Sequence, residues 1–212
     1  MKSRLLFISH QTEDYSYLDS IQIALQGGCK LIQLRMKEAS DEEVTKVGQK
    51  AKVLCSSYNA TLTVDDRVEV AKSLKLAGVH LGLQDMRIDA ARAVLGSDAL
   101  IGGTANELAD MLEHQKRGAN YIGLGPYRFT KTKQNLSPTL GLQGYTQLVK
   151  EAYKQGMYLP IYAIGGITLE DIPLLMKTGI WGISLSSTIL NATDPVKQTE
   201  RIIETINNSI DE

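Results

Sequence analysis

The sequence is poor in cysteine and has no long hydrophobic run. Its 212 residues include 2 cysteines, Cys29 and Cys55, which form neither a CxxC pair nor a zinc-ligand pattern. We therefore expect no disulfide framework and a cytoplasmic, reducing environment. No apolar stretch approaches the roughly 20 residues that a membrane-spanning helix needs. The apolar run near the N-terminus is too short for a secretory signal.

The sequence also lacks an excess of either charge. Its 23 Lys+Arg and 24 Asp+Glu residues leave a formal net charge of −1. This balance gives no general attraction to nucleic acid or to an anionic membrane, and we expect neither as a partner. Any anion-binding site must then be local. A hydrophobic content of 43% with 22% charged residues is typical of a globular protein, and we expect one domain over residues 1–212.

Short apolar and β-branched runs recur along the chain and predict parallel strands. They are nearly continuous in apolar character, as expected for strands that are covered on both faces. The eight runs are residues 5–9, 31–35, 61–65, 78–81, 100–104, 121–125, 161–165 and 183–187.

Helix signals lie between these runs. Ser40 with Glu43, and Thr168 with Asp171, form capping-box patterns. Glycines that are expected to end helices are Gly27, Gly118, Gly156 and Gly179. Eight strands alternating with helices predict a single-domain (β/α)8 TIM barrel. A doubly wound open sheet is the alternative, because periodicity does not separate the two folds.

Polar residues gather where the predicted strands end. In a barrel, the loops at the carboxyl ends of the strands build the active site. The residues at these ends are Gln33, Arg35, Lys37, Asp65, Asp66, Asp85, Thr104, Thr130, Thr132, Lys133, Gly166, Ser186 and Ser187.

These residues suggest two anion sites of different chemistry. Cations and carboxylates together suit a diphosphate bridged by Mg²⁺. Glycine and serine after the last two strands suit a phosphate held mainly by backbone groups. The separate alternatives are an Asx turn at Asp65-Asp66, a surface pair of Arg35 with Lys37, and a helix cap at Asp85.

The three histidines give little sign of acid–base chemistry. His80 is expected to be a packed strand residue, while His10 and His114 are expected to be peripheral. The sequence offers no convincing Ser-His or Cys-His arrangement for covalent catalysis.

Several motifs together resemble the thiamine-phosphate synthase family. They are "IQLRMKEA", "DDRVEVAKSLKLAGVHLGLQDM", "GPYRFTKTK", "YAIGGI" and "ISLSSTIL", in the family's order and over nearly the whole chain. The resemblance implies a transferase. It would join a pyrimidine methyl diphosphate to a thiazole phosphate, forming thiamine phosphate and releasing pyrophosphate. Its partners would be these small molecules, and the chain would be a monomer or a homodimer.

The resemblance also implies a role for each matching residue. Gln33, Arg35 and Lys37 would bind the pyrimidine diphosphate, with Lys133 on its pyrophosphate. Arg35, Lys37 and Lys133 would be the catalytic cations, and Asp66 and Asp85 would hold Mg²⁺. The thiazole phosphate would contact Thr130, Thr132, Gly166, Ser186 and Ser187. Because Asp65 and Thr104 stand at positions of the family's motifs, they too are candidate substrate contacts.

Four positions depart from the family pattern. Asp65 replaces an asparagine, and its carboxylate would repel a diphosphate unless Mg²⁺ or Arg35 compensates. Thr104 replaces a serine and keeps the hydroxyl, Asn106 replaces a histidine, and Lys131 adds a charge between two threonines.

Two alternative functions follow. A thiazole tautomerase of the same fold would need the histidine that Asn106 replaces and no diphosphate site. A barrel that only binds thiamine precursors would release no pyrophosphate, and Asp65 is its best support.

Overall fold

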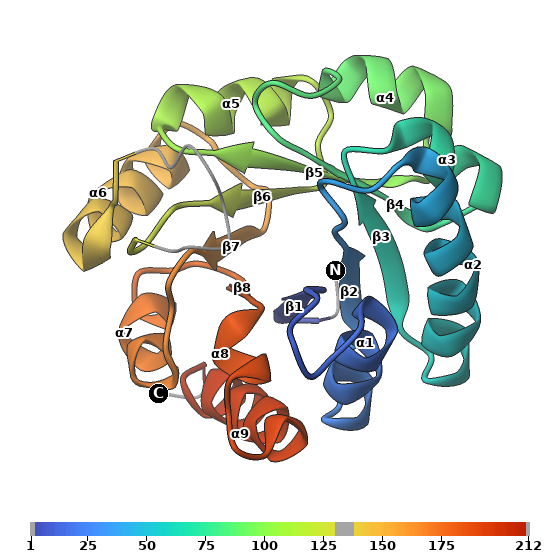
Figure 1. Ribbon diagram of the computed structural model, residues 1–212. Helices are drawn as coiled ribbons and strands as arrows, with labels where there is room; N and C mark the ends of the chain where they lie inside the picture. Colours follow the sequence, from blue (N-terminus) through green and yellow to red (C-terminus); the bar gives the residue numbers. More distant parts are fainter. Residues whose placement is uncertain (1–2, 130–137, 211–212) are drawn as a thin grey trace.

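The computed structural model describes residues 3–129 and 138–210. Its strands all pair in parallel with their neighbours in sequence and close into a barrel (Figure 1). The strands are β1 (Leu5–Ile8), β2 (Leu31–Leu34), β3 (Thr61–Asp65), β4 (Gly78–Leu81), β5 (Leu100–Ala105), β6 (Tyr121–Leu124), β7 (Ile161–Ile164) and β8 (Gly182–Leu185).

The barrel closes between its first and last strands. In the register of β1 with β8, Leu5 pairs with Ile183 and Leu6 with Ser184. This pairing confirms the (β/α)8 barrel, and the alternative of an open doubly wound sheet is wrong. The last predicted run extended too far, because β8 ends at Leu185 and Ser187 already begins a helix.

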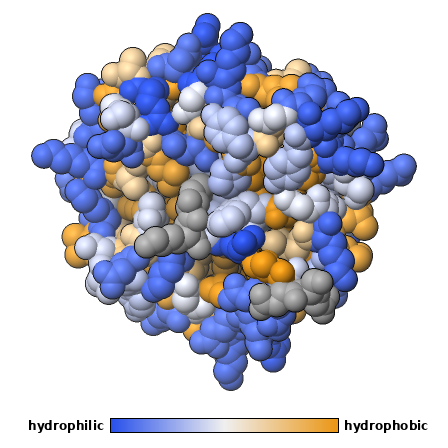
Figure 2. Space-filling view, turned by 180° about the vertical axis from the view of Figure 1, so that it is seen from behind, coloured by the Kyte–Doolittle hydropathy of each residue, from blue (hydrophilic) through white to orange (hydrophobic). Residues whose placement is uncertain are grey.

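Helices form a ring around the barrel (Figure 1). They are α1 (Tyr17–Gln26), α2 (Asp41–Ser57), α3 (Val68–Leu74), α4 (Ile88–Leu95), α5 (Leu108–Lys116), α6 (Gly141–Lys154), the 3₁₀ turn η1 (Leu169–Asp171), α7 (Ile172–Met176), α8 (Ser187–Leu190) and α9 (Pro195–Asn208). None of the helices in the described ranges has the length and apolar character that a membrane crossing requires. Figure 2 shows hydrophilic side chains around the rim, with hydrophobic surface between them.

The predicted helix signals are confirmed. The capping boxes of Ser40 and Thr168 are both present. Gly118, Gly156 and Gly179 all adopt positive φ at or just after helix ends. At the end of α1, however, Gly27 has φ −75° and the left-handed residue is Gly28, with φ 92°. Gly27 is nevertheless the C-cap of α1, so the helix ends where the sequence predicts, and the left-handed turn follows one residue later.

Side chains alternate between the two faces of the barrel wall. Outward residues such as Phe7 and Ile101 belong to the main core between strands and helices. The other buried cluster includes Leu6, Tyr121 and Tyr162, and it occupies the barrel interior. The rings of Tyr121 and Tyr162 meet edge to face at 5.6 Å. This apolar layer closes the interior below the polar strand ends.

Candidate active site

A buried carboxylate, that of Asp65, is the centre of a charged cluster at the end of β3. Asp65 is 8% exposed. Gln33 Nε2 donates a hydrogen bond of 2.7 Å to its Oδ1. Arg35 Nε and Lys37 Nζ lie 3.4 Å and 3.3 Å from its Oδ2. Two cations thus offset the cost of burying this charge, which is how the chain accommodates a carboxylate at this position. Arg35 and Lys37 therefore both pair with one buried carboxylate.

Lys37 also binds the neighbouring carboxylate. Its Nζ lies 2.5 Å from Asp66 Oδ2. Asp66 has φ 61°, and its N–H donates to the carbonyl of His80 at 2.9 Å. Burial alone would lower the pKa of Lys37, but the charges of Asp65, Asp66 and Asp85 outweigh it and raise that pKa. Lys37 therefore remains an ammonium throughout the neutral pH range.

Asp66 and Asp85, the two predicted metal ligands, both act on the charge of Lys37. Asp66 Oδ1 is buried and has no hydrogen-bond partner among the described residues. Asp85 Oδ2 accepts the N–H of Gly82 at 2.6 Å, whereas Arg87 is the N-cap of α4, so Asp85 does not cap that helix. Residues 3–129 and 138–210 contain no group of three or more metal-ligating side chains. Mg²⁺ suits such a site because it takes one or two carboxylates and completes its shell with phosphate oxygens and water.

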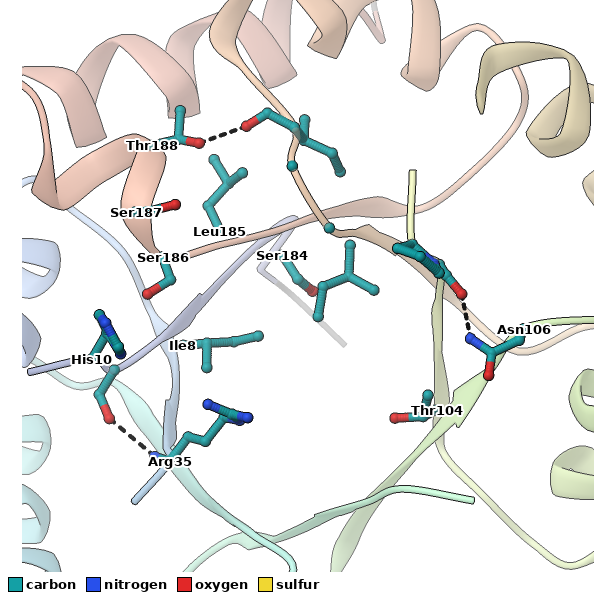
Figure 3. A pocket seen from close by; sticks show the side chains of 17 residues that line it. Ile8, His10, Arg35, Thr104, Asn106, Ser184, Leu185, Ser186, Ser187 and Thr188 are labelled. Atoms are coloured by element: carbon teal, nitrogen blue, oxygen red, sulfur yellow. Dashed lines mark hydrogen bonds between the residues drawn. The ribbon is translucent and has the colours of Figure 1, made fainter. Parts of the chain in front are cut away.

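A pocket lies at the same end of the barrel and shares Arg35 with the charged cluster. Gly166, Ser186 and Ser187 line it, as does Ser184. The hydroxyl oxygens of Ser184 and Ser186 are buried and have no hydrogen-bond partner in the part of the chain that the structure describes. Figure 3 shows the side chains of Ser186 and Ser187 along one wall. These hydroxyl groups are suited to bind a polar group of a ligand.

Thr104 lies on the opposite wall of the pocket (Figure 3) and contacts His80. His80 Nε2 is 3.0 Å from Thr104 Oγ1, and its Nδ1 is 3.1 Å from the hydroxyl of Tyr121. Both ring nitrogens are thus engaged by hydroxyl groups inside the barrel. The prediction that His80 is a packed strand residue is confirmed, and its contact positions Thr104.

The prediction that His10 and His114 are peripheral is wrong. His10 lines the pocket beside Ser186 (Figure 3), and burial followed by the nearby charge of Arg35 lowers its pKa. His114 is 7% exposed, and its Nε2 lies 2.8 Å from the carbonyl oxygen of Thr104. The sequence did contain a signal for the burial of His114, because it lies three residues after the buried Met111 on α5. No sequence pattern indicated that His10 lines a pocket.

Sequence reasoning also missed Ser9 and the inward position of Ser184. Ser9 Oγ accepts the backbone N–H of Arg35 at 3.0 Å and so ties the end of β1 to the end of β2. Thr130, Thr132 and Lys133, which were expected to contact the substrates, lie outside the described residues, as does Lys131.

Comparison with known proteins gives a consistent result. The family model described as thiamine monophosphate synthase matches residues 5–189. Curated thiamine-phosphate synthases of Bacteroides fragilis and Bacteroides thetaiotaomicron are 56% and 54% identical over 199 residues, or 94% of this chain and 98% and 95% of theirs. A solved thiamine phosphate pyrophosphorylase from Pyrococcus furiosus is 32% identical, with a TM-score of 0.85, over 99% of this chain and 98% of that one.

These relatives favour neither of the two alternative functions. Asn106, at the position where a tautomerase would need histidine, carries an amide that does not titrate. The matches extend over the strand ends that form the charged cluster and the pocket. The chain therefore belongs to the thiamine monophosphate synthase family, and it is a transferase that forms thiamine phosphate.

Proposed function

We propose that the charged cluster binds the pyrimidine diphosphate and that the adjoining pocket binds the thiazole phosphate. The observation that carries this proposal is that two sites of different chemistry share Arg35 at one end of the barrel. One site is rich in charge, and the other is lined by glycine and serine. Gln33 is fixed by Asp65 at the base of the first site, where it meets the pyrimidine part of the substrate.

The reaction breaks the bond between the methylene carbon and the diphosphate oxygen, and the electron pair leaves with pyrophosphate. The thiazole nitrogen then supplies the pair that forms the new carbon–nitrogen bond. Because the aminopyrimidine stabilises a positive charge on the methylene carbon, departure precedes attack. The protein has to stabilise the leaving charge and orient the nucleophile, and no covalent nucleophile is needed.

The catalytic cations are Arg35, Lys37 and Lys133. Asp66 and Asp85 would hold Mg²⁺, which supplies further charge stabilisation on the diphosphate oxygens when bound. Lys37 is placed to exchange its bond to Asp66 for one to the diphosphate, because the two are alternative anionic partners for the same ammonium. Lys133 belongs to this proposal through its sequence motif alone.

The thiazole phosphate is assigned to Gly166, Ser186 and Ser187, with Thr130 and Thr132 as further contacts from their motif. The two buried hydroxyl oxygens without partners in the described ranges support this placement. Thr104 faces the same space and would orient the thiazole ring. Asp65 remains a substrate-binding residue in this scheme because it holds Gln33 toward the pyrimidine, while its charge competes with the diphosphate for Arg35.

The wider setting follows from the same proposal. The whole chain, residues 1–212, would act as one barrel on two small molecules, as a monomer or a homodimer in the cytoplasm. No part of the proposed reaction calls for nucleic acid or a membrane.

Removal of single ligands tests this assignment. Asp66→Ala and Asp85→Ala are each expected to lower kcat at least a hundredfold, with partial recovery at high Mg²⁺, since each removes one ligand of the cation. Asp98→Ala, which alters an exposed aspartate in the loop after α4, is the matched control. Unchanged kcat and unchanged Mg²⁺ dependence in both variants would refute the metal assignment.

A further inference from the structure

In the loop after β7, three successive carbonyls accept hydrogen bonds from the segment after β6. The N–H of Tyr127 donates to the carbonyl of Ile164 and the N–H of Arg128 to that of Gly165, both at 2.9 Å. The guanidinium of Arg128 donates from Nη1 to the carbonyl of Gly166 at 3.2 Å. The segment after β6 therefore fixes three consecutive peptide planes of the loop after β7.

The other side of these peptides carries three N–H groups. A trans peptide points its N–H opposite its carbonyl, so the N–H groups of Gly165, Gly166 and Ile167 point away from Tyr127 and Arg128. These N–H groups donate no hydrogen bond within residues 3–129 and 138–210. The same three residues line the pocket that contains Ser184 and Ser186. Successive N–H groups of this kind form a concave anion site.

Glycine is required at both central positions. Gly165 and Gly166 have φ values of 98° and 63°, which side chains disfavour. A Cβ on Gly165 would lie 2.8 Å from Pro126 Cβ, and one on Gly166 would lie 2.9 Å from Arg128 Cβ. The close approach of the segment after β6 thus depends on these glycines, and it leaves no room for the loop to relax toward that segment.

The third peptide is held by a side chain, and that side chain is itself anchored. Arg128 Nη1 and Nη2 lie 2.6 Å and 2.5 Å from the two carboxylate oxygens of Asp171. Asp171 Oδ2 also accepts the N–H of Thr168 at 2.8 Å, and the Arg128 guanidinium stacks 4.8 Å from the centre of the Tyr127 ring. Asp171 is 7% exposed. The planar guanidinium therefore joins Gly166 to Asp171, the last residue of η1, in a fixed orientation.

We propose that Arg128 and Asp171 are positioning residues that orient the Gly165–Ile167 amides toward the phosphate of the thiazole substrate. The inference rests on the proposed function for the identity of the ligand. Arg128 lies behind the peptides that it orients, on the side opposite their N–H groups, so it does not touch the phosphate. The carboxylate of Asp171 balances its charge, and its effect is on the geometry of the amides.

The test compares phosphorylated with unphosphorylated thiazole. Arg128→Ala is expected to lower kcat/KM for the thiazole phosphate about tenfold and that for the thiazole alcohol less than twofold, because only the former uses the oriented amides. Arg128→Lys should recover part of the loss, since lysine keeps a positively charged donor group but not the two-pronged geometry of the guanidinium. Arg87→Ala, which removes an exposed ion pair with Asp89, is the matched control. Equal losses with both thiazoles would overturn the proposal.

Phosphate binding gives a readout that is independent of catalysis. Inorganic phosphate titrated into the wild-type chain should shift the amide resonances of Gly165, Gly166 and Ile167, and Arg128→Ala should raise its Kd about tenfold. An unchanged Kd in the folded variant would overturn the positioning role. A wild-type chain that binds phosphate in this way but forms no thiamine phosphate would contradict the proposed function instead.

Discussion

The ammonium of Lys37 lies 2.5 Å from Asp66 Oδ2, on the carboxylate that is proposed to bind Mg²⁺. The same ammonium lies 3.3 Å from Asp65 Oδ2. A divalent cation on the unpartnered Oδ1 of Asp66 would repel the ammonium of Lys37 on Oδ2, so we expect the two to compete. In the proposed reaction, the diphosphate would offer Lys37 a new partner when the metal weakens its contact with Asp66.

Loss of the Lys37 ammonium should strengthen metal binding in the absence of substrate. We expect Lys37→Met to lower the Mg²⁺ Kd about fivefold, which corresponds to the roughly 1 kcal/mol of a partly exposed ion pair. Titration calorimetry without substrates measures this effect. Lys46→Met, which removes an exposed pair with Glu42, should leave the Kd unchanged. Weaker binding in Lys37→Met would mean that the ammonium and the metal do not compete.

Neutralising Asp65 should release cations for the substrate. In Asp65→Asn the amide oxygen can still accept from Gln33, while the attraction for Arg35 and Lys37 is lost. We expect KM for the pyrimidine diphosphate to fall about three- to tenfold, because the diphosphate no longer competes with Asp65 for Arg35 and Lys37. Steady-state kinetics at saturating thiazole phosphate measures it. A higher KM would show that the carboxylate itself helps to bind the substrate.

The strand order and the gathering of charged groups could be predicted, because apolar runs and strand-end residues are local features. The side-chain contacts that these charged groups make could not be predicted. The contact of Gln33 with Asp65 depends on the register of β2 with β3, which pairs Gln33 with Thr63. The position of His10 was missed for a related reason, since it follows β1 by two residues and its surroundings come from distant strands.

His10 should report the arrival of an anion. Its pKa lies below the ordinary value of about 6.5 because of burial and the charge of Arg35. A phosphate in the pocket offsets the repulsion from Arg35, so we expect the His10 pKa to rise when phosphate is added. NMR titration of the imidazole resonances measures it, with His114 as the internal control. A His10 pKa that stays the same or falls would place the phosphate elsewhere.

The same shift makes stability depend on pH. Since the folded pKa of His10 lies below the unfolded value, the unfolded chain takes up the proton first as the pH falls. The free energy of unfolding should therefore decrease below about pH 6.5 until the folded pKa is reached. In His10→Gln, the free energy of unfolding measured with denaturant should decrease less over this pH range. An identical pH profile in both proteins would contradict the shift.

The barrel interior should tolerate no side chain at Gly102. A Cβ there would lie 2.1 Å from Cζ of Tyr121, which is fully buried. We expect Gly102→Ala to lower the free energy of unfolding by about 3 kcal/mol, the upper range for overpacking a core. Denaturant unfolding measures it, and Gly96→Ala, with no atom near its added Cβ but a positive φ, separates packing from backbone strain. Equal losses of unfolding free energy in Gly102→Ala and Gly96→Ala would mean that Tyr121 moves aside at no cost, contrary to the prediction.

The most direct test of the account is to mix the purified chain with the pyrimidine diphosphate, the thiazole phosphate and Mg²⁺, while following pyrophosphate and thiamine phosphate together. The account predicts equal amounts of both products, formed only when both substrates and the metal are present, and lost in Lys133→Ala. Pyrophosphate release without thiamine phosphate, or no product from the folded chain, would contradict it.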